Sequence, residues 1–358
     1  MSPKTFFTDK LAVAPGKCLH GRYKDYPGCP CLDVCPKKAI TLNPLEIDYG
    51  LCDGCGICAN ACPAGALSVK ESSLAEVASQ VVSVVGKELR IRCSRVEGRS
   101  AAVTCLGALD FAFLDALCLR SAKDLMLLAG DCEYCATAAG GEIIRSNIDA
   151  ANRMLLLFGR GERVSLARSA DRQDLESGSR RAMFRGMGRM IARFVPELEH
   201  PEQDSDPGPV PARQQRALEI IRGLEEGRRD IDRHVPLPFT AKEIDADKCD
   251  GCKGLPRCVR LCPAQALGYF AESGSAGITF KAARCIGCAL CESACHNAAV
   301  KSSALKSGQV EELWRTKTLM GFEARECGGC GGISIVMSGG LCQDCQQRER
   351  KLGWESVG

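Results

Sequence analysis

The chain has 358 residues, a formal net charge of +3 and 25 cysteines. A chain of this length suggests two or three domains with cores of their own, and its balanced charge gives no overall attraction to nucleic acid or to a membrane surface. Most cysteines fall in C-x2-C and C-x3-C runs, which are spaced too tightly for the disulfide framework of a small secreted domain. The composition therefore favours metal-binding thiolates over disulfide cross-links.

The sequence carries no sign of export or of a membrane span. Residues 1–18 contain no sustained apolar stretch, and no window reaches the roughly 18 apolar residues that a membrane span needs. Arg180 and Arg181 resemble a twin-arginine export signal, but they are internal and no apolar region follows them. The expected location is the cytoplasm, under low oxygen.

The first cysteine-rich region, residues 1–72, contains two runs. The second run has the spacing C-x2-C-x2-C-x3-C-P, by which bacterial ferredoxins hold a cubic [4Fe–4S] cluster. The first run has the spacing C-x10-C-x-C-x3-C-P, so it departs from this pattern in its first half. Short apolar segments follow the runs at residues 39–42 and 66–69, and they predict small strands.

Together these two runs resemble a two-cluster ferredoxin domain. In that family the last cysteine of one run ligates the cluster held by the other run. The resemblance implies one cluster on Cys18, Cys29, Cys31 and Cys62, and a second on Cys35, Cys52, Cys55 and Cys58. Zinc is the alternative occupant, but zinc sites use sets of four ligands rather than interleaved sets of eight.

Residues 86–170 change to alternating strands and helices. Short apolar segments predict buried strands at 89–94, 101–105, 124–130 and 163–169. The segments 110–122 and 140–158 have the apolar spacing of helices. This alternation predicts a small parallel α/β layer. No glycine-rich phosphate loop occurs, so a bound nucleotide or flavin is not predicted.

Four cysteines lie near the ends of the predicted strands: Cys93, Cys105, Cys132 and Cys135. The carboxyl ends of parallel strands form one crevice, so these thiols are expected to converge there. Cys118 lies mid-helix on an apolar face and is predicted to be a core residue. The segments CLG and GDCEYC resemble the delta-subunit family of methyl-viologen-reducing hydrogenases, and this resemblance implies a [2Fe–2S] cluster. Structural zinc and unligated core cysteines are the alternatives.

Residues 171–246 are predicted to connect the two halves. Arg181, Arg185, Arg189 and Arg193 recur on one helical face, opposite an apolar face. Such a helix suits an acidic partner or an anionic lipid surface, or it lies on its own protein with a solvated arginine face. An acidic, proline-rich tether then precedes a second helix, which is predicted to start near Pro211.

The second cysteine-rich region, residues 247–305, repeats the arrangement of the first. Its first run has the spacing C-x2-C-x5-C-x3-C-P, and its second has the spacing C-x2-C-x2-C-x3-C. The ferredoxin resemblance implies one cluster on Cys249, Cys252, Cys258 and Cys295, and another on Cys262, Cys285, Cys288 and Cys291. His296 stands where proline usually follows the last cysteine, and it is expected to tune the potential by a hydrogen bond to a sulfur.

The tail, residues 320–350, contains two further C-x2-C pairs. These are Cys327 with Cys330, and Cys342 with Cys345. Paired C-x2-C knuckles are typical of a zinc ribbon, and the alternative is a single rubredoxin-like iron. Zinc is favoured because the tail is too small to form a hydrophobic core, and a structural zinc ion that stabilises its fold explains the pattern fully.

The predicted fold is therefore multi-domain and α+β. It has two ferredoxin-like dicluster modules that flank a small parallel α/β domain, and a zinc-ribbon-like knuckle near the C-terminus. The predicted cofactors are four [4Fe–4S] clusters, one [2Fe–2S] cluster and one zinc ion.

No catalytic Ser/His/Asp set is recognisable, and the chain has only four histidines. The prediction is a non-catalytic subunit that relays single electrons between a redox enzyme and another donor or acceptor. Its partners are expected to be other subunits of a larger complex, with no nucleic acid and with peripheral contact to a membrane or a membrane-bound protein. The alternatives are a catalytic or electron-bifurcating, disulfide-reductase-like component, and a redox sensor.

Overall fold

The computed structural model describes most of the chain as two compact units, Met1–Asp232 and Arg233–Gly358. The described residues are 11–23, 26, 28–83, 87–98, 100–159, 161, 163–168, 210–223, 234–254, 256–272, 274–335 and 340–355. They include every cysteine. The predicted basic helix with Arg181, Arg185, Arg189 and Arg193 lies outside them. Within them, no helix is both long enough and apolar enough to cross a membrane.

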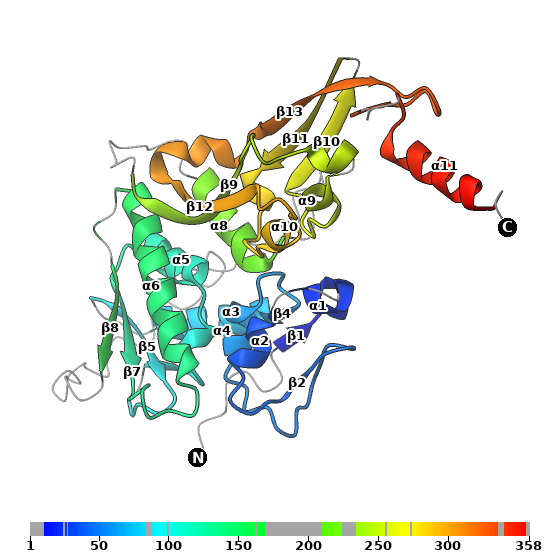
Figure 1. Ribbon diagram of the computed structural model, residues 1–358. Helices are drawn as coiled ribbons and strands as arrows, with labels where there is room; N and C mark the ends of the chain where they lie inside the picture. Colours follow the sequence, from blue (N-terminus) through cyan, green and yellow to red (C-terminus); the bar gives the residue numbers. More distant parts are fainter. Residues whose placement is uncertain are drawn as a thin grey trace. The chain divides into compact units, whose positions relative to one another are not determined.

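The first unit begins with short elements around the first two cysteine runs (Figure 1). Strands β1 (Leu11–Val13) and β4 (Leu67–Val69) pair antiparallel, as do β2 (Ile40–Thr41) and β3 (Glu46–Ile47). Between them lie η1 (Pro15–Lys17) and the short helices α1 (Leu19–Arg22), α2 (Pro30–Asp33) and α3 (Ile57–Ala61). Elements this short bury little apolar surface, so the cysteine loops make up most of this region.

A four-stranded parallel sheet follows in the first unit, in the order β6-β5-β7-β8. Its strands are β5 (Leu89–Cys93), β6 (Ala101–Val103), β7 (Leu125–Ala129) and β8 (Val164–Arg168). Its helices are α4 (Glu71–Ser83), η2 (Leu106–Ala108), α5 (Phe111–Ser121) and α6 (Ala139–Leu157). Figure 1 shows α6 lying along the sheet. Each predicted strand and helix of residues 86–170 is present, with its ends moved by a residue or two, whereas α4 was not predicted.

The sheet and its helices bury a continuous hydrophobic core. Ile91, Val103, Leu114, Leu125 and Leu127 are fully or almost fully buried in it. Asp110 starts α5 as its N-cap, because its carboxylate accepts a hydrogen bond of 2.9 Å from the backbone N–H of Phe113. Helix α8 (Ala212–Arg222), the helix predicted to start near Pro211, packs against α5.

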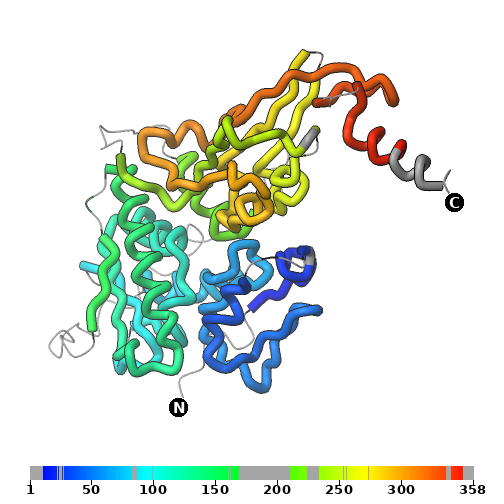
Figure 2. Tube along the Cα trace, viewed as in Figure 1, coloured from blue at the N-terminus to red at the C-terminus, as the bar shows by residue number. Residues whose placement is uncertain are grey.

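The second unit places its two cysteine runs beside a longer antiparallel sheet. Strands β9 (Pro236–Ile244) and β12 (Val300–Lys306) pair antiparallel. A second sheet has the order β10-β11-β13-β14, with β10 (Leu267–Glu272), β11 (Gly274–Lys281), β13 (Thr316–Glu326) and β14 (Ile333–Ser334). Figure 2 shows the orange β13 beside the yellow β10–β11 hairpin, although α10, β12 and η7 lie between them in the sequence.

The helical elements of the second unit are short, apart from the last. They are η5 (Gly251–Gly254), α9 (Arg257–Arg260), η6 (Ala282–Arg284), α10 (Leu290–Ser293), η7 (Ser307–Leu313) and α11 (Gln343–Glu355). Strands β9 and β12 occupy the same places relative to the cysteine runs as β1 and β4 do in the first unit. Leu11 pairs with Val69 in one, and Lys242 pairs with Ser302 in the other.

Candidate cluster and metal sites

The cysteines of the two ferredoxin-like regions line four separate cavities, each named here by one of its cysteines. The Cys18 site is lined by Cys18, Cys29, Cys31 and Cys62, and the Cys52 site by Cys35, Cys52, Cys55 and Cys58. The Cys249 site is lined by Cys249, Cys252, Cys258 and Cys295, and the Cys285 site by Cys262, Cys285, Cys288 and Cys291. Each site takes three thiols from one run and the fourth from the end of the other, which is the grouping implied by the ferredoxin resemblance.

Backbone N–H groups point at several of these sulfurs. Ala39 donates to the Sγ of Cys35 over 3.4 Å, Ala266 to Cys262 over 3.2 Å, and Ala299 to Cys295 over 3.3 Å. Such N–H donors stabilise negative charge on a ligating sulfur and so help to set a cluster's potential. Four free thiols round one cavity, with backbone donors behind them, fit the ligand set of a cubic [4Fe–4S] cluster.

Burial makes four of the candidate ligand thiols weaker acids than an ordinary cysteine. It raises the pKa of Cys31, Cys55, Cys258 and Cys285 to about 12. A thiol must lose its proton to ligate iron, so assembly of a cluster releases protons and depends on pH.

The backbone of the last run in each module adopts the left-handed conformation at two positions. Gly54 and Gly56 have φ of 68° and 75°, and the matching Gly287 and Ala289 have φ of 66° and 56°. An L-residue rarely adopts this conformation, so glycine is favoured there. The last run of each module can therefore wrap its cavity with the same local fold.

The four cysteines of the parallel sheet come together at the carboxyl ends of its strands. Cys93 ends β5, Cys105 follows β6, and Cys132 and Cys135 follow β7. Burial raises the pKa of Cys105 to about 11, with Cys93 and Cys132 close enough to act on it as well. The Sγ of Cys135 lies 3.1 Å from the Oγ1 of Thr137. These four residues are called the sheet-edge site, whereas Cys118 is fully buried in the hydrophobic core.

The sheet-edge site lies directly against the Cys52 site within the first unit. Cys55, Ile57 and Cys105 form one buried apolar cluster. The side-chain amide of Asn60, on α3, donates a hydrogen bond of 2.8 Å to the carbonyl of Gly107. This contact joins two candidate redox sites through a single buried isoleucine, and nothing in the sequence spacing predicted it.

Glycines make this contact possible. A Cβ added at Gly140 would lie 2.4 Å from the Sγ of Cys105, and one at Gly56 would lie 2.7 Å from the Cβ of Ala108. No side chain larger than hydrogen fits at either position without movement of the backbone or of a cysteine. The close approach of α3, η2 and α6 therefore depends on these residues.

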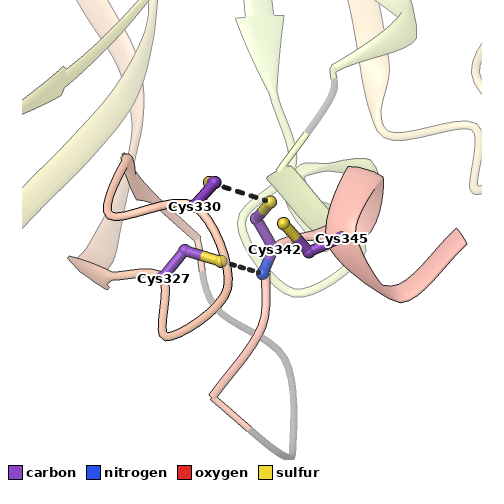
Figure 3. Close-up of side chains that lie close together, drawn as sticks. All are labelled: Cys327, Cys330, Cys342 and Cys345. Atoms are coloured by element: carbon purple, nitrogen blue, oxygen red, sulfur yellow. Dashed lines mark hydrogen bonds between the residues drawn. The ribbon is translucent and has the colours of Figure 1, made fainter. Parts of the chain in front are cut away.

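The C-terminal cysteines form a compact set of four. The Sγ atoms of Cys327, Cys330, Cys342 and Cys345 all lie within 4.8 Å of one another. Figure 3 shows these four side chains gathered in one place. The sulfurs of a tetrahedral zinc site, with Zn–S bonds of about 2.3 Å, lie about 3.8 Å apart. The set therefore fits a tetrahedral metal ion.

Backbone donors support a thiolate at this C-terminal set. The N–H of Cys342 donates to the Sγ of Cys327 over 3.1 Å, and the N–H of Gly329 donates to it over 3.4 Å. These two bonds lower the pKa of Cys327 to about 6. The lowered pKa favours the thiolate form of Cys327, which is the form that binds a cation.

Two regions of the chain match family models of iron–sulfur domains. Residues 45–68 match the 4Fe-4S binding domain, and residues 248–299 match the 4Fe-4S dicluster domain. These two stretches of the chain are therefore similar to iron–sulfur binding domains. Neither match covers residues 18–35, where the cysteine spacing departs from the ferredoxin pattern, nor residues 86–170, so the resemblance to a hydrogenase delta subunit stays a prediction.

The chain is also similar to a curated relative, hydrogenase-4 component A of Escherichia coli (strain K12). The two are 40% identical over 72 residues, which is 20% of this chain. The aligned stretch spans about a third (33%) of the length of that relative. No solved structure matches the chain.

Residues that the cysteine patterns did not single out also lie at these sites. Lys242 is buried and lines the Cys285 site. Burial alone would lower its pKa, but the hydrogen bond to Glu292 and the nearby Cys291 and Cys285 outweigh that effect and raise the pKa. His296 lines the Cys249 site, with its Nε2 3.8 Å from the carboxylate of Asp250. Its predicted hydrogen bond to a sulfur remains a prediction.

Proposed function

We propose that the chain relays single electrons through a series of iron–sulfur clusters between other subunits of an oxidoreductase complex. The observation that carries this proposal is the contact between the Cys52 site and the sheet-edge site across Ile57. Two candidate redox centres joined by one buried side chain form a continuous path for an electron, with water kept out.

The proposed ligands are the four cysteines of each named site. The Cys18, Cys52, Cys249 and Cys285 sites would each hold a [4Fe–4S] cluster, the sheet-edge site a [2Fe–2S] cluster, and the C-terminal set a zinc ion. The clusters supply one-electron chemistry when bound. The chain's own residues ligate the iron, donate N–H groups to sulfur and exclude water from the path.

The wider setting is inferred from the similarity to hydrogenase-4 component A. That protein's name describes it as one component of a hydrogenase. We infer by analogy that this chain is likewise one subunit among several, placed between a redox enzyme and a second donor or acceptor. All four cubane sites supply four thiols each, so at these sites no observation favours a cluster with an iron left open for substrate.

Metal analysis and electron counting of the anaerobically purified full chain test the cofactor set. Four cubane clusters and one [2Fe–2S] cluster predict about 18 iron atoms and about one zinc per chain, and uptake of about five electrons on full reduction. Replacing Cys132 and Cys135 together by serine should remove about two irons and about one electron, and should leave zinc unchanged. The matched control, replacement of Cys342 and Cys345, should remove zinc and leave iron and electron uptake unchanged.

Affinity purification of the tagged chain from its native cell, under argon, tests the relay. We expect redox subunits to co-purify, and their substrate oxidation should reduce the chain's clusters within a single turnover. The Cys132/Cys135 double variant should bind the same subunits but pass electrons more slowly. If the double variant keeps all its iron, or passes electrons at the normal rate, the sheet-edge site is not part of the path.

A further inference from the structure

Three matching positions differ between the Cys52 site and the Cys285 site. In the first unit they are Leu11 on β1, Val69 opposite it on β4, and Ala59 directly after Cys58. In the second unit they are Lys242 on β9, Ser302 opposite it on β12, and Glu292 directly after Cys291. Leu11 lines the Cys52 site and Lys242 lines the Cys285 site. An apolar trio at one site is thus replaced by a polar trio at the other.

Hydrogen bonds join the three side chains of the polar trio. The Nζ of Lys242 donates to the Oε1 of Glu292 over 2.6 Å and also to the hydroxyl of Ser302. The hydroxyl of Ser302 in turn donates to Glu292. Placing a charged ammonium in the protein interior is costly unless it is paired and hydrogen-bonded in this way. The arrangement holds the ammonium group in one position at the wall of the cavity.

The charges of the trio do not cancel at the cavity. The side chain of Lys242 is only 2% exposed, whereas that of Glu292 is 32% exposed. Water screens the more exposed carboxylate better, so the buried cation dominates the field that reaches the sulfurs. The ammonium acts on the thiols of both Cys285 and Cys291. At the Cys52 site Leu11 carries no charge, and the charged residues that line the cavity, Lys37 and Asp53, are of opposite sign and neither is buried.

We propose that Lys242 sets the reduction potential of the cluster at the Cys285 site, and makes it higher than that of the matching cluster at the Cys52 site. This inference rests on the proposed relay. Reduction adds one electron, taken from the neighbouring [4Fe–4S] cluster of the same module, and one negative charge, with no bond made or broken. The fixed cation stabilises that charge, and so raises the potential of the cluster at the Cys285 site.

The test is a spin-resonance redox titration of the full chain and of Lys242→Met. We expect one of the four cubane clusters to titrate at a lower potential by at least a tenfold change in its equilibrium constant, which is about 59 mV for a one-electron couple. Lys242→Arg keeps the cation and should restore most of the shift. Glu292→Gln removes the opposing charge and should move the same cluster to higher potential.

Leu11→Met is the matched control at the Cys52 site, and it should move no potential. If Lys242→Met keeps its full iron content and all potentials stay in place, the inference is wrong while the relay stands. If the purified wild-type chain holds no cubane clusters, the relay itself fails. If Lys242→Met loses the cluster, Glu292→Gln decides: an unchanged potential in that variant, at full iron content, would show that Lys242 is only a structural residue.

Discussion

The last cysteine runs of the two modules, residues 52–62 and 285–295, share one spacing but lie in different surroundings. Both have C-x2-C-x2-C-x3-C, and both turn through left-handed residues at matching positions. The run of residues 52–62 is buried: Ile57 is fully inaccessible and contacts the edge of the parallel sheet. In the run of residues 285–295, Ala289 and Ser293 are exposed, and Glu292 forms an ion pair with the buried Lys242.

This difference separates what local sequence decides from what tertiary packing decides. The spacing and the left-handed turns shape the ligand set, and they recur almost unchanged in both modules. Exposure, neighbouring charge and contact with a further redox site come from strands and helices far away in sequence. Two clusters with the same ligands are therefore expected to differ in potential and in the route by which electrons reach them.

The largest expected effect comes from removing the cysteine that crosses between runs. Cys35→Ala in the first module and Cys262→Ala in the second should each lose about four irons, because each removes one ligand of a cubane. Iron analysis scaled to amino-acid analysis measures the loss. The spin-resonance signal lost in Cys35→Ala should be the one lost in Cys55→Ala. If it is instead the signal lost in Cys18→Ala, the crossed assignment is wrong.

A smaller effect is expected at the position where the two runs differ in packing. Gly56→Ala forces an L-residue to a φ of 75° and places its Cβ 2.7 Å from the Cβ of Ala108. Backbone strain of about 1–2 kcal/mol and overpacking of about 1–3 kcal/mol should both destabilise the first unit. The denaturant concentration that bleaches half of the cluster absorbance in a fixed time should fall.

The matched substitution in the second module, Ala289→Gly, is expected to have no destabilising effect. Ala289 is exposed and already adopts a φ of 56°, so Ala289→Gly should be neutral or should stabilise the second unit by up to about 1 kcal/mol. Equal sensitivity of the two positions would show that the contact of Gly56 with Ala108 contributes nothing.

The sequence predicted most of what depends on short-range pattern. The ferredoxin resemblance implied the crossed groups of cysteines, whereas the C-terminal set and the strands of residues 86–170 follow from spacing and periodicity. Helix α4 was not predicted, although Leu74, Val77 and Val81 lie on its buried face. The β10–β11 hairpin and β13 were not predicted either.

Features that depend on contacts distant in sequence could not be predicted in this way. In the sequence Lys242 looks like an ordinary charged residue. It lies at the Cys285 site because β9 pairs with β12, where Ser302 is opposite Lys242. The contact of Cys55 with Cys105 likewise needs α3 to pack against η2 and α6. Single-sequence patterns carry no information about which distant segments meet.

The smallest expected effect concerns one hydrogen bond of this contact. Asn60→Ala removes the 2.8 Å bond from the side-chain amide to the carbonyl of Gly107 and leaves that buried carbonyl without this donor. The expected cost is about 1 kcal/mol, less than that of Gly56→Ala. Arg213 contacts the backbone carbonyl of Asn60, which the substitution keeps, so the loss can be assigned to the side chain.

In the run of residues 285–295, Ser293 occupies the position that matches Asn60, and Ser293→Ala is the control for Asn60→Ala. Ser293 is exposed, and its hydroxyl donates only to nearby carbonyls, that of Leu290 over 3.1 Å and that of Ala289 over 3.3 Å. Ser293→Ala should therefore change stability by less than about 0.5 kcal/mol. Anaerobic denaturation, followed by cluster absorbance, compares the two variants. If Asn60→Ala proves no more costly than Ser293→Ala, then burial and glycine packing alone hold the Cys52 site against the sheet edge.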